Sequence, residues 1–411
     1  MLTGGARWCP LFIFMVNSLT EYSVHRYSSA MHKVSIEKVA SYEQADVRAG
    51  LQRLLEPLGG IGAFVRPGER VLLKPNMLAG KPPEAAVTTH PAVVREVIRL
   101  VQSAGGIPLV GDSPGIGTQR GVARKSGILA VVEECGAEFV EFSRTSEVTS
   151  KGLFKRFEVA AEYLEADKVI NLPKLKTHEM MTLTCGVKNI FGILVGAAKP
   201  AWHMQAGFDR ELFARALIDL YMVRPPSLTI VDAVTSMEGD GPSSGDPRHT
   251  GLLLAGRNAL SVDLVAAEIA GIPKKLLFVE QEAAKQGLAG ADRREIEIVG
   301  IEPQDLDIQP FILPPLSDVQ FGLPRFIKNA LRNHLTTRPE QILSKCVLCG
   351  ACVRACPPQV IRIEGQKLVF DYHRCIRCFC CRELCPEKAL AVRKGILLKI
   401  LGGKGNNSPA G

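Results

Sequence analysis

Two cysteine-rich segments near the end of the chain hold the residues with the clearest capacity for chemistry. The first reads Cys346-Val-Leu-Cys349-Gly-Ala-Cys352-Val-Arg-Ala-Cys356-Pro357, and the second repeats its spacing from Cys375 to Pro386. This is the C-x2-C-x2-C-x3-C-P spacing, in which three thiolates of one loop bind one iron–sulfur cluster and the fourth binds the other cluster. The spacing therefore predicts two [4Fe–4S] clusters. The first is held by Cys346, Cys349, Cys352 and Cys385, and the second by Cys375, Cys378, Cys381 and Cys356.

Other uses of these cysteines fit the pattern less well. Disulfide frameworks belong to oxidising compartments and mostly to small secreted chains, whereas this chain has 411 residues. Zinc usually takes two C-x2-C pairs with a longer spacer. Cys380 is a ninth cysteine with no place in the repeat, and it could compete with Cys381 for the second cluster. The repeated spacing favours Cys381.

The cysteine-rich stretch resembles bacterial two-cluster ferredoxins over roughly residues 341–393. In that family a short strand follows each cysteine run, and residues 359–363 and 389–392 fill those places here. The resemblance implies a small α+β, two-cluster ferredoxin-like domain at 341–395.

The composition is that of an ordinary globular protein of two or three domains. Three of the twelve cysteines lie outside the cluster region, which indicates a reducing compartment, and we expect the cytoplasm. The net charge of +8 is too small to indicate nucleic-acid binding. No apolar run reaches the roughly 18 residues of a membrane span. We expect residues 1–30 to be a disordered leader or a mis-assigned start before Met31.

From Met31 onward, short apolar strands alternate with helices, which predicts an α/β domain at 31–308 with a mostly parallel sheet and helices on both faces. The expected helices include 120–134, 210–221 and 259–269. The expected strands include 107–110, 138–142, 167–171, 227–232 and 251–255.

Residues 309–340 are predicted to be a linker. It contains a basic amphipathic helix at 324–338, which either docks a partner or membrane surface or packs the cluster domain onto the main body. The latter is favoured. Residues 396–411 are expected to be a flexible tail.

Ligands of parallel α/β sheets bind where the strands end, and polar residues gather there. Lysines attract anions as point charges, and a histidine can move a proton. We therefore expect His178 and Lys176 to be catalytic, and we expect an anionic ligand to be bound by Lys74, Asn76, Asp112, Lys174, Lys188 and Asn189. The same stretch continues to Lys199 and His203. Each of these side chains could instead be a solvated or structural group.

The α/β region resembles the family known as domain of unknown function 362. Five motifs carry the likeness in order, and they are Lys74-Pro-Asn76, Thr89-His-Pro91, Gly111-Asp-Ser-Pro-Gly115, Asn171-Leu-Pro-Lys-Leu-Lys-Thr-His178 and Lys188-Asn-Ile-Phe-Gly192. Members often carry a two-cluster ferredoxin module. The resemblance implies an α/β fold and iron–sulfur clusters, and it implies no particular reaction.

Together these patterns predict an iron–sulfur electron-transfer protein. The first hypothesis is a ferredoxin-dependent oxidoreductase that takes electrons from a redox partner protein or reduced carrier and acts on an unknown anionic small molecule. The alternative is an electron carrier or adaptor whose α/β domain docks a partner enzyme. A third reading makes the clusters structural or sensory.

Overall fold

The computed structural model describes residues 31–196, 199, 202–203, 209–314 and 338–393. The leader at 1–30 and the tail at 396–411 lie outside the described residues. So does the basic helix expected at 324–338, apart from Arg338. No helix in the described part of the chain is long and apolar enough to cross a membrane.

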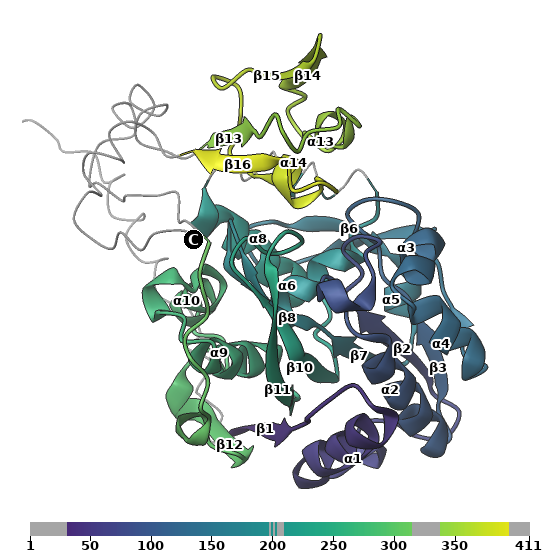
Figure 1. The fold of residues 1–411 in the computed structure, drawn as a ribbon. Helices are drawn as coiled ribbons and strands as arrows, with labels where there is room; N and C mark the ends of the chain where they lie inside the picture. Colours follow the sequence, from purple (N-terminus) through teal and green to yellow (C-terminus); the bar gives the residue numbers. More distant parts are fainter. Residues whose placement is uncertain (1–30, 197–198, 200–201, 204–208, 315–337, 394–411) are drawn as a thin grey trace, which may run out of the picture. The chain divides into compact units, whose positions relative to one another are not determined.

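The α/β region is built on a mixed, mostly parallel ten-stranded sheet (Figure 1). Strands β1, β11 and β10 are paired antiparallel, whereas β12–β1, β10–β7, β7–β2, β2–β3 and β3–β4 are parallel. Off this path, β8 (Lys174–His178) pairs with β10 and with β9 (Thr182–Thr184). In spatial order the main strands are β12 (Ile296–Gly300), β1 (His32–Lys38), β11 (Asp246–Gly256), β10 (Leu228–Glu238), β7 (Lys168–Leu172), β2 (Arg70–Pro75), β3 (Ile107–Val110) and β4 (Glu138–Phe139).

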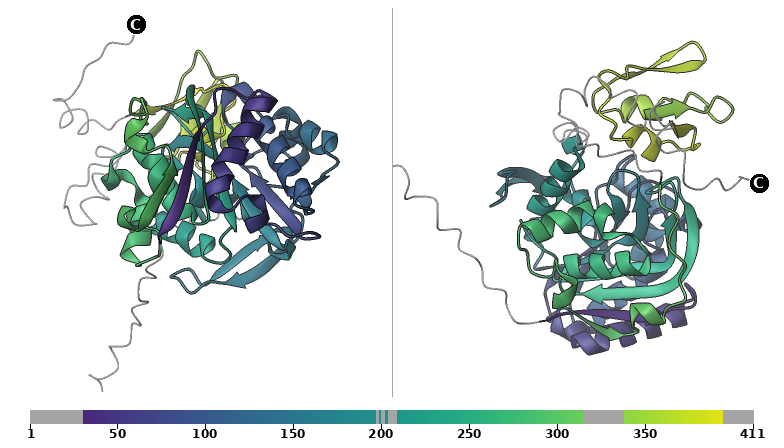
Figure 2. Two further views of the ribbon diagram at one scale, coloured as in Figure 1. Left: turned by 90° about the horizontal axis from the view of Figure 1, so that it is seen from below. Right: turned by 90° about the vertical axis from the view of Figure 1, so that its left-hand side faces the viewer.

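Helices cover the sheet because its central strands are apolar on both faces. In β2, Val71 and Leu73 pack into one core while Leu72 packs into another, as the alternation of side chains along a strand requires. Figures 1 and 2 show the helices lying against the sheet. They are α1 (Gln44–Leu55), α2 (Pro91–Ser103), α3 (Gln119–Lys125), α4 (Ile128–Glu134), α5 (Ala161–Glu165), α6 (Gly186–Asn189), α8 (Arg210–Tyr221), α9 (Ala259–Ile269) and α10 (Phe278–Lys285).

The cysteine-rich region forms a separate small set of elements. Strand β13 (Arg338–Gln341) pairs antiparallel with β16 (Leu390–Arg393), and β14 (Ile361–Glu364) pairs antiparallel with β15 (Lys367–Phe370). The short helices α13 (Ala351–Arg354) and α14 (Cys380–Glu383) follow the two cysteine loops. The predicted fold class is confirmed: a mostly parallel sheet with helices, plus a small α+β region.

Several expected elements differ in detail. The helix expected at 120–134 is two helices, α3 and α4, because Gly127 between them adopts a left-handed conformation with φ of 75°. The strand expected at 138–142 ends at Phe139. The short strands expected at 227–232 and 251–255 are parts of β10 and β11, each 11 residues long, which form an antiparallel hairpin.

The stretch after Asn171 contains regular structure beyond the predicted elements. Strand β8 (Lys174–His178) turns back through β9 (Thr182–Thr184) before α6, and all residues of β8 and β9 are buried. A second hairpin, β5 (Thr145–Thr149) and β6 (Arg156–Ala160), was not predicted. The segment β8–β9–α6 therefore carries five of the predicted site residues: Lys174, Lys176, His178, Lys188 and Asn189.

Candidate functional site

The first set of four cysteines surrounds a cavity. Cys346, Cys349, Cys352 and Cys385 all line it, although Cys385 comes from the second cysteine run. Burial and, to a smaller extent, the neighbouring Cys385 and Cys346 raise the pKa of the Cys352 thiol to about 11. Thiols that disfavour each other's ionisation fit a site whose charge is neutralised by bound metal.

The second set is more deeply enclosed. Cys356, Cys375, Cys378 and Cys381 are all buried, whereas Cys349 of the first set is exposed. Burial raises the pKa of the Cys381 thiol well above its usual value, and Cys378, Cys375 and Cys356 add to the effect. In the described residues, no three His, Cys, Asp or Glu side chains converge on a single metal-ion position. The first crossed grouping lines one cavity, and the groups that act electrostatically on Cys381 include the other three members of the second grouping. The assignment of these cysteines to two clusters stays a prediction.

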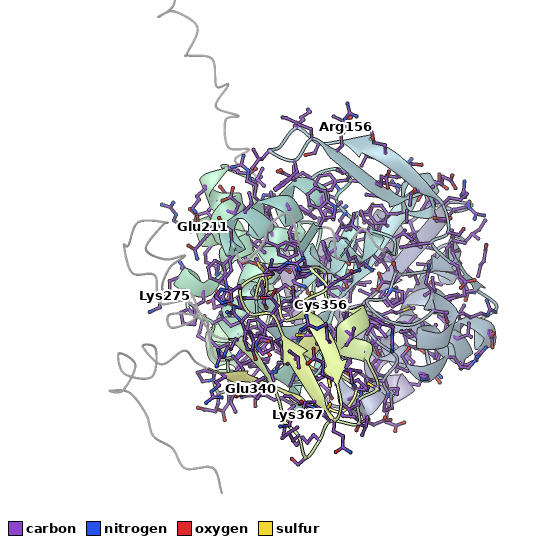
Figure 3. All side chains as sticks on the ribbon, turned by 90° about the horizontal axis from the view of Figure 1, so that it is seen from above. Arg156, Glu211, Lys275, Glu340, Cys356 and Lys367 are labelled. Atoms are coloured by element: carbon purple, nitrogen blue, oxygen red, sulfur yellow. The ribbon has the colours of Figure 1, made fainter. Side chains whose placement is uncertain are left out.

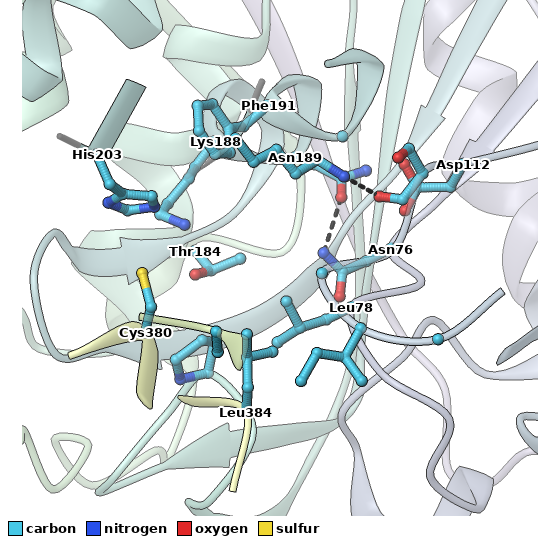
Figure 4. A pocket seen from close by; sticks show the side chains of 18 of the residues that line it. Asn76, Leu78, Asp112, Thr184, Lys188, Asn189, Phe191, His203, Cys380 and Leu384 are labelled. Carbon is cyan, nitrogen blue, oxygen red and sulfur yellow. Dashed lines mark hydrogen bonds between the residues drawn. The ribbon is translucent and has the colours of Figure 1, made fainter. Parts of the chain in front are cut away.

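A pocket of about 390 Å3 opens where the strand ends of the α/β region meet the cysteine-rich region. Figure 4 shows its side chains converging from the loops after β2 and β3, from β9 and α6, and from α14. Among the described lining residues four are basic and one is acidic: Lys176, Lys188, Lys199 and Arg354 against Asp112. The pocket therefore carries an excess of positive charge.

Beneath this pocket lies a buried ion pair. The Nζ of Lys74 is 2.6 Å from Oδ1 of Asp112, and it donates a hydrogen bond of 2.6 Å to the Asn189 carbonyl. The side chain of Lys74 is fully buried and that of Asp112 is 4% exposed. The backbone of Gly192 passes so close that a Cβ atom there would lie 2.1 Å from Asp112 Oδ1, which only glycine allows.

An amide network joins this pair to the neighbouring strands. The Nδ2 of Asn76 donates to Asn189 Oδ1, and the Nδ2 of Asn189 donates to Asn171 Oδ1 and to the Lys74 carbonyl. The Nζ of Lys176 donates to Asn76 Oδ1 and to the Val87 carbonyl. Buried networks whose members are satisfied in this way hold their side chains in fixed positions.

Helix α6 presents Lys188 and Asn189, and Asp263 fixes where it begins. The carboxylate of Asp263 accepts hydrogen bonds from the backbone N–H groups of Gly186 and Val187 at 2.6 and 2.9 Å. These are N–H groups that the first turn of a helix leaves without partners. The adjacent Cys185 is buried against Asp263 and has a raised pKa owing to burial, as expected of a packing residue.

Lys199 and His203 were absent from the sequence-based set of binding residues, yet both line the pocket. Burial lowers the pKa of Lys199 to about 7; Asp112 opposes this shift, while Lys74 and Lys188 add to it. Its Nζ donates to the Ser113 and Pro114 carbonyls. Lys199 can therefore exchange a proton near neutral pH.

Nδ1 of His203 and Oγ1 of Thr184 are buried polar atoms of the pocket that have no hydrogen-bond partner among the described residues. Their side chains face the cavity in Figure 4. His203 is 7% exposed and Thr184 is 3% exposed. Leaving such atoms unsatisfied is costly, so a bound ligand or water is expected to satisfy them.

Three predicted residues do not line the pocket: Lys74, which forms the ion pair described above, and Lys174 and His178. Lys174 is buried and donates to Asp232 Oδ2 at 2.9 Å and to the Tyr42 hydroxyl at 2.7 Å, and it does not line the pocket. The Nδ1 of His178 accepts from the backbone N–H groups of Met180 and Met181. Burial lowers the pKa of His178 well below its usual value, and Lys188 lowers it further. The neutral imidazole is therefore held by backbone, and its catalytic role stays a prediction.

The cysteine-rich region contributes directly to the pocket. Cys380, the ninth cysteine, lines it together with Leu384 and Arg354, and its sulfur faces the cavity in Figure 4. Two residues further along, Arg382 forms ion pairs with Glu179 at 3.2 Å and with Asp240. Arg382 and Glu179 are both buried, so this contact stabilises the wall that Cys380 belongs to.

Comparison with known proteins assigns both regions to families. The model for "Domain of unknown function (DUF362)" matches residues 71–268, and that for "4Fe-4S dicluster domain" matches residues 338–386. The thylakoid-associated protein sll1697 of Synechocystis sp. is 40% identical over 301 residues, which are 73% of this chain and 94% of that protein. The chain belongs to the DUF362 family. The recognition made from the five motifs and the cysteine runs is thereby confirmed.

Among solved structures, the lactate racemase apoprotein from Thermoanaerobacterium thermosaccharolyticum shows a weak likeness. The TM-score is 0.39 at 14% identity, over 59% of this chain and 57% of that one. The dicluster family match supports [4Fe–4S] clusters in this chain, for which two is the typical number.

Proposed function

We propose that this DUF362 protein is a ferredoxin-dependent oxidoreductase that acts on an anionic small molecule bound in the basic pocket. The observation that carries the proposal is the shared wall. Lys188, Lys199 and Thr184 line the same cavity as Cys380, which directly precedes the predicted cluster ligand Cys381. A substrate in the pocket would thus lie beside a redox centre.

The thiols fit two [4Fe–4S] clusters. One would be held by the four cysteines around the cavity described above, and the other by Cys356, Cys375, Cys378 and Cys381. When bound, such clusters store and pass single electrons. The dicluster family match and the two spatial groupings of thiols support this assignment.

The protein's own residues would bind and orient the anion. Lys188 and Lys176 supply positive charge from one side of the pocket, and Arg354 supplies it from the cysteine-rich side. The hydroxyl of Thr184 and Nδ1 of His203 are available for hydrogen bonds. Lys199, with its pKa near 7, is better suited than His178 to hold and release a proton at the ligand.

The test uses the full chain, loaded with iron and sulfide under anaerobic conditions and reduced with dithionite, with the excess reductant removed. Anionic oxidants, beginning with small carboxylates, are added one at a time, and reoxidation is followed by visible absorbance. A true substrate is expected to accelerate reoxidation in the wild type and to lose this effect in Lys188→Met.

Lys151→Met, on an exposed loop residue, is the matched control and should behave as wild type. If no anion accelerates reoxidation although the clusters are assembled, the oxidoreductase proposal is wrong. The alternative of an electron carrier or adaptor, whose α/β domain docks a partner enzyme, would then be preferred.

The surrounding assignments follow from the same reasoning. We propose an α/β domain at 31–308, a linker at 309–340 and a cluster domain at 341–395. A reducing compartment such as the cytoplasm suits the cysteine usage. The thylakoid association in the name of the Synechocystis relative makes a membrane surface the alternative.

A further inference from the structure

A second cleft lies next to the anion pocket, with which it shares part of its wall, and against the first set of cysteines. Its volume is about 600 Å3, and both Cys349 and Cys385 form part of its wall. The rest comes from the loop after β2, from α3 and the residues before it, from α13, and from Ser243, Leu384 and Pro386. The lining residues are Ala79, Gly80, Lys81, Ile116, Gly117, Thr118, Gly121, Val122, Lys125, Ser243, Ala351, Arg354, Leu384 and Pro386.

The charge of this cleft has one sign. Lys81, Lys125 and Arg354 line it, and its described lining residues include no Asp or Glu. Lys125 and Arg354 are exposed. The surrounding region is basic too, because residues 338–393 contain ten Lys or Arg and five Asp or Glu. Positive potential of this kind steers and orients a negatively charged partner.

Apolar residues also lie in and near the cleft. Val122 and Leu384 line the cleft, and Val347, in the loop between the first two cysteines, is 66% exposed. Protein interfaces typically combine an apolar centre with a charged rim. A small inorganic anion would gain no favourable contact from these apolar side chains.

The two sets of cysteines differ in access from outside. Cys349 is exposed and reaches this cleft, whereas Cys356, Cys375, Cys378 and Cys381 are all buried. The buried set is the one whose neighbour, Cys380, faces the anion pocket. The first set is therefore accessible to an outside molecule through Cys349, and the buried set is close to the ligand.

We propose that this cleft is the docking site of an acidic one-electron carrier protein that donates electrons at Cys349. The inference rests on the proposed function and adds the site and the charge of the donor. Each docking event would oxidise the carrier by one electron and reduce the centre held by the first set of cysteines by one. Two carriers would be needed for each two-electron reduction in the pocket.

The test measures binding directly. The probe is an acidic [2Fe–2S] ferredoxin in its oxidised form, and the target is the cluster-loaded full chain. Affinity is measured by calorimetry at about 20 mM and about 300 mM salt, because screening weakens exposed charge pairs. We expect the double charge reversal K81E/K125E to weaken binding about tenfold or more at low salt, and the difference to shrink at high salt.

The matched control is K155E/K275E, which changes the net charge by the same amount at two exposed lysines that do not line the cleft. Lys275 lies at the edge of the molecule, away from Cys356, in Figure 3. The control should bind within about twofold of wild type if the contact is local. Lys125→Glu alone, at an exposed residue, serves if the double variant does not assemble its clusters, as checked by iron content.

Equal weakening in both double variants, or no weakening in either, would overturn the docking site. Reduced flavin mononucleotide forms the second arm. If K81E/K125E weakens its binding and leaves ferredoxin binding intact, the cleft takes a small anion and the proposal is wrong. The anion-dependent reoxidation after dithionite reduction needs no carrier, so failure of the proposed function is seen separately.

Discussion

Replacing Lys74 should destabilise the α/β region rather than weaken ligand binding. The Lys74→Met change leaves the Asp112 carboxylate, which is 4% exposed, with a backbone hydrogen bond from Met77 and without its cation at 2.6 Å. Removing one partner of a buried ion pair typically costs about 3–5 kcal/mol. At about 2–4 °C per kcal/mol for a domain of this size, the melting temperature of the α/β region should fall by roughly 10 °C.

A double-mutant cycle separates the pair from its surroundings. K74M/D112N removes both charges, so no unpaired charge stays buried. Its loss in free energy of unfolding should be about 2 kcal/mol smaller than the sum of the losses of the two single variants. Gly192→Ala should disturb the same pair, because its Cβ would lie 2.5 Å from Lys74 Nζ. Unfolding is followed by far-UV circular dichroism.

Lys168→Met is the matched control. The Nζ of Lys168 is 3.8 Å from Glu69 and its side chain is 37% exposed, so its loss should cost less than about 1 kcal/mol. The reasoning is refuted if K74M melts like K168M. It is also refuted if K74M keeps its stability and loses anion binding, which is the outcome that a direct ligand contact, as predicted from the sequence, would give.

Three further predictions concern the pocket and its wall. Lys199 has a pKa near 7 and is cationic below it, so affinity for sulfate, which stays a dianion in this range and is measured by calorimetry, should fall by up to about tenfold per pH unit above pH 7, and Lys199→Met should remove this dependence. Arg382→Met removes the buried ion pair with Glu179 and should make the cluster region more susceptible to limited proteolysis. Arg393→Met, at a largely exposed ion pair, should not, and equal cleavage of the two variants would contradict a stabilising role of Arg382. Cys381→Ser should lose about four of about eight irons and Cys380→Ser none, and the reverse result would make Cys380 the ligand.

The elements predicted correctly have local signals. The bounds of α8 and α9 match the prediction, since each has a helical apolar pattern preceded by a capping side chain, Asp209 or Asn258, that accepts from the helix N–H groups. The strands of the β10–β11 hairpin are longer than predicted, because the continuation of β10 pairs with residues about ten positions away across the Gly239–Gly245 turn. Such pairing depends on burial that a local pattern does not reveal.

The candidate site shows the same limit. Lysines at strand ends could be recognised as a group, but Lys74 and Lys174 belong to buried ion pairs, whereas Lys188 and Lys199 line the cavity. Sequence spacing does not distinguish these roles, because the deciding partners, Asp112 and Asp232, come from other strands. Cys380 could be recognised as surplus to the repeat, yet its place in the pocket depends on a contact with residues about 190 positions earlier.

The two cavities share part of their walls, and this bears on how an electron donor and a substrate could be kept apart. Arg354 and Leu384 line both, and Arg354 also donates a hydrogen bond to the Cys349 carbonyl. A carrier at the second cleft would contact one side of these residues while the anion contacts the other. Since both occupants are negatively charged, Arg354 can attract each of them while the wall prevents their direct contact. Electrons would then have to pass through the cysteine-rich region, which is the arrangement that a protein transferring single electrons to a small anion requires.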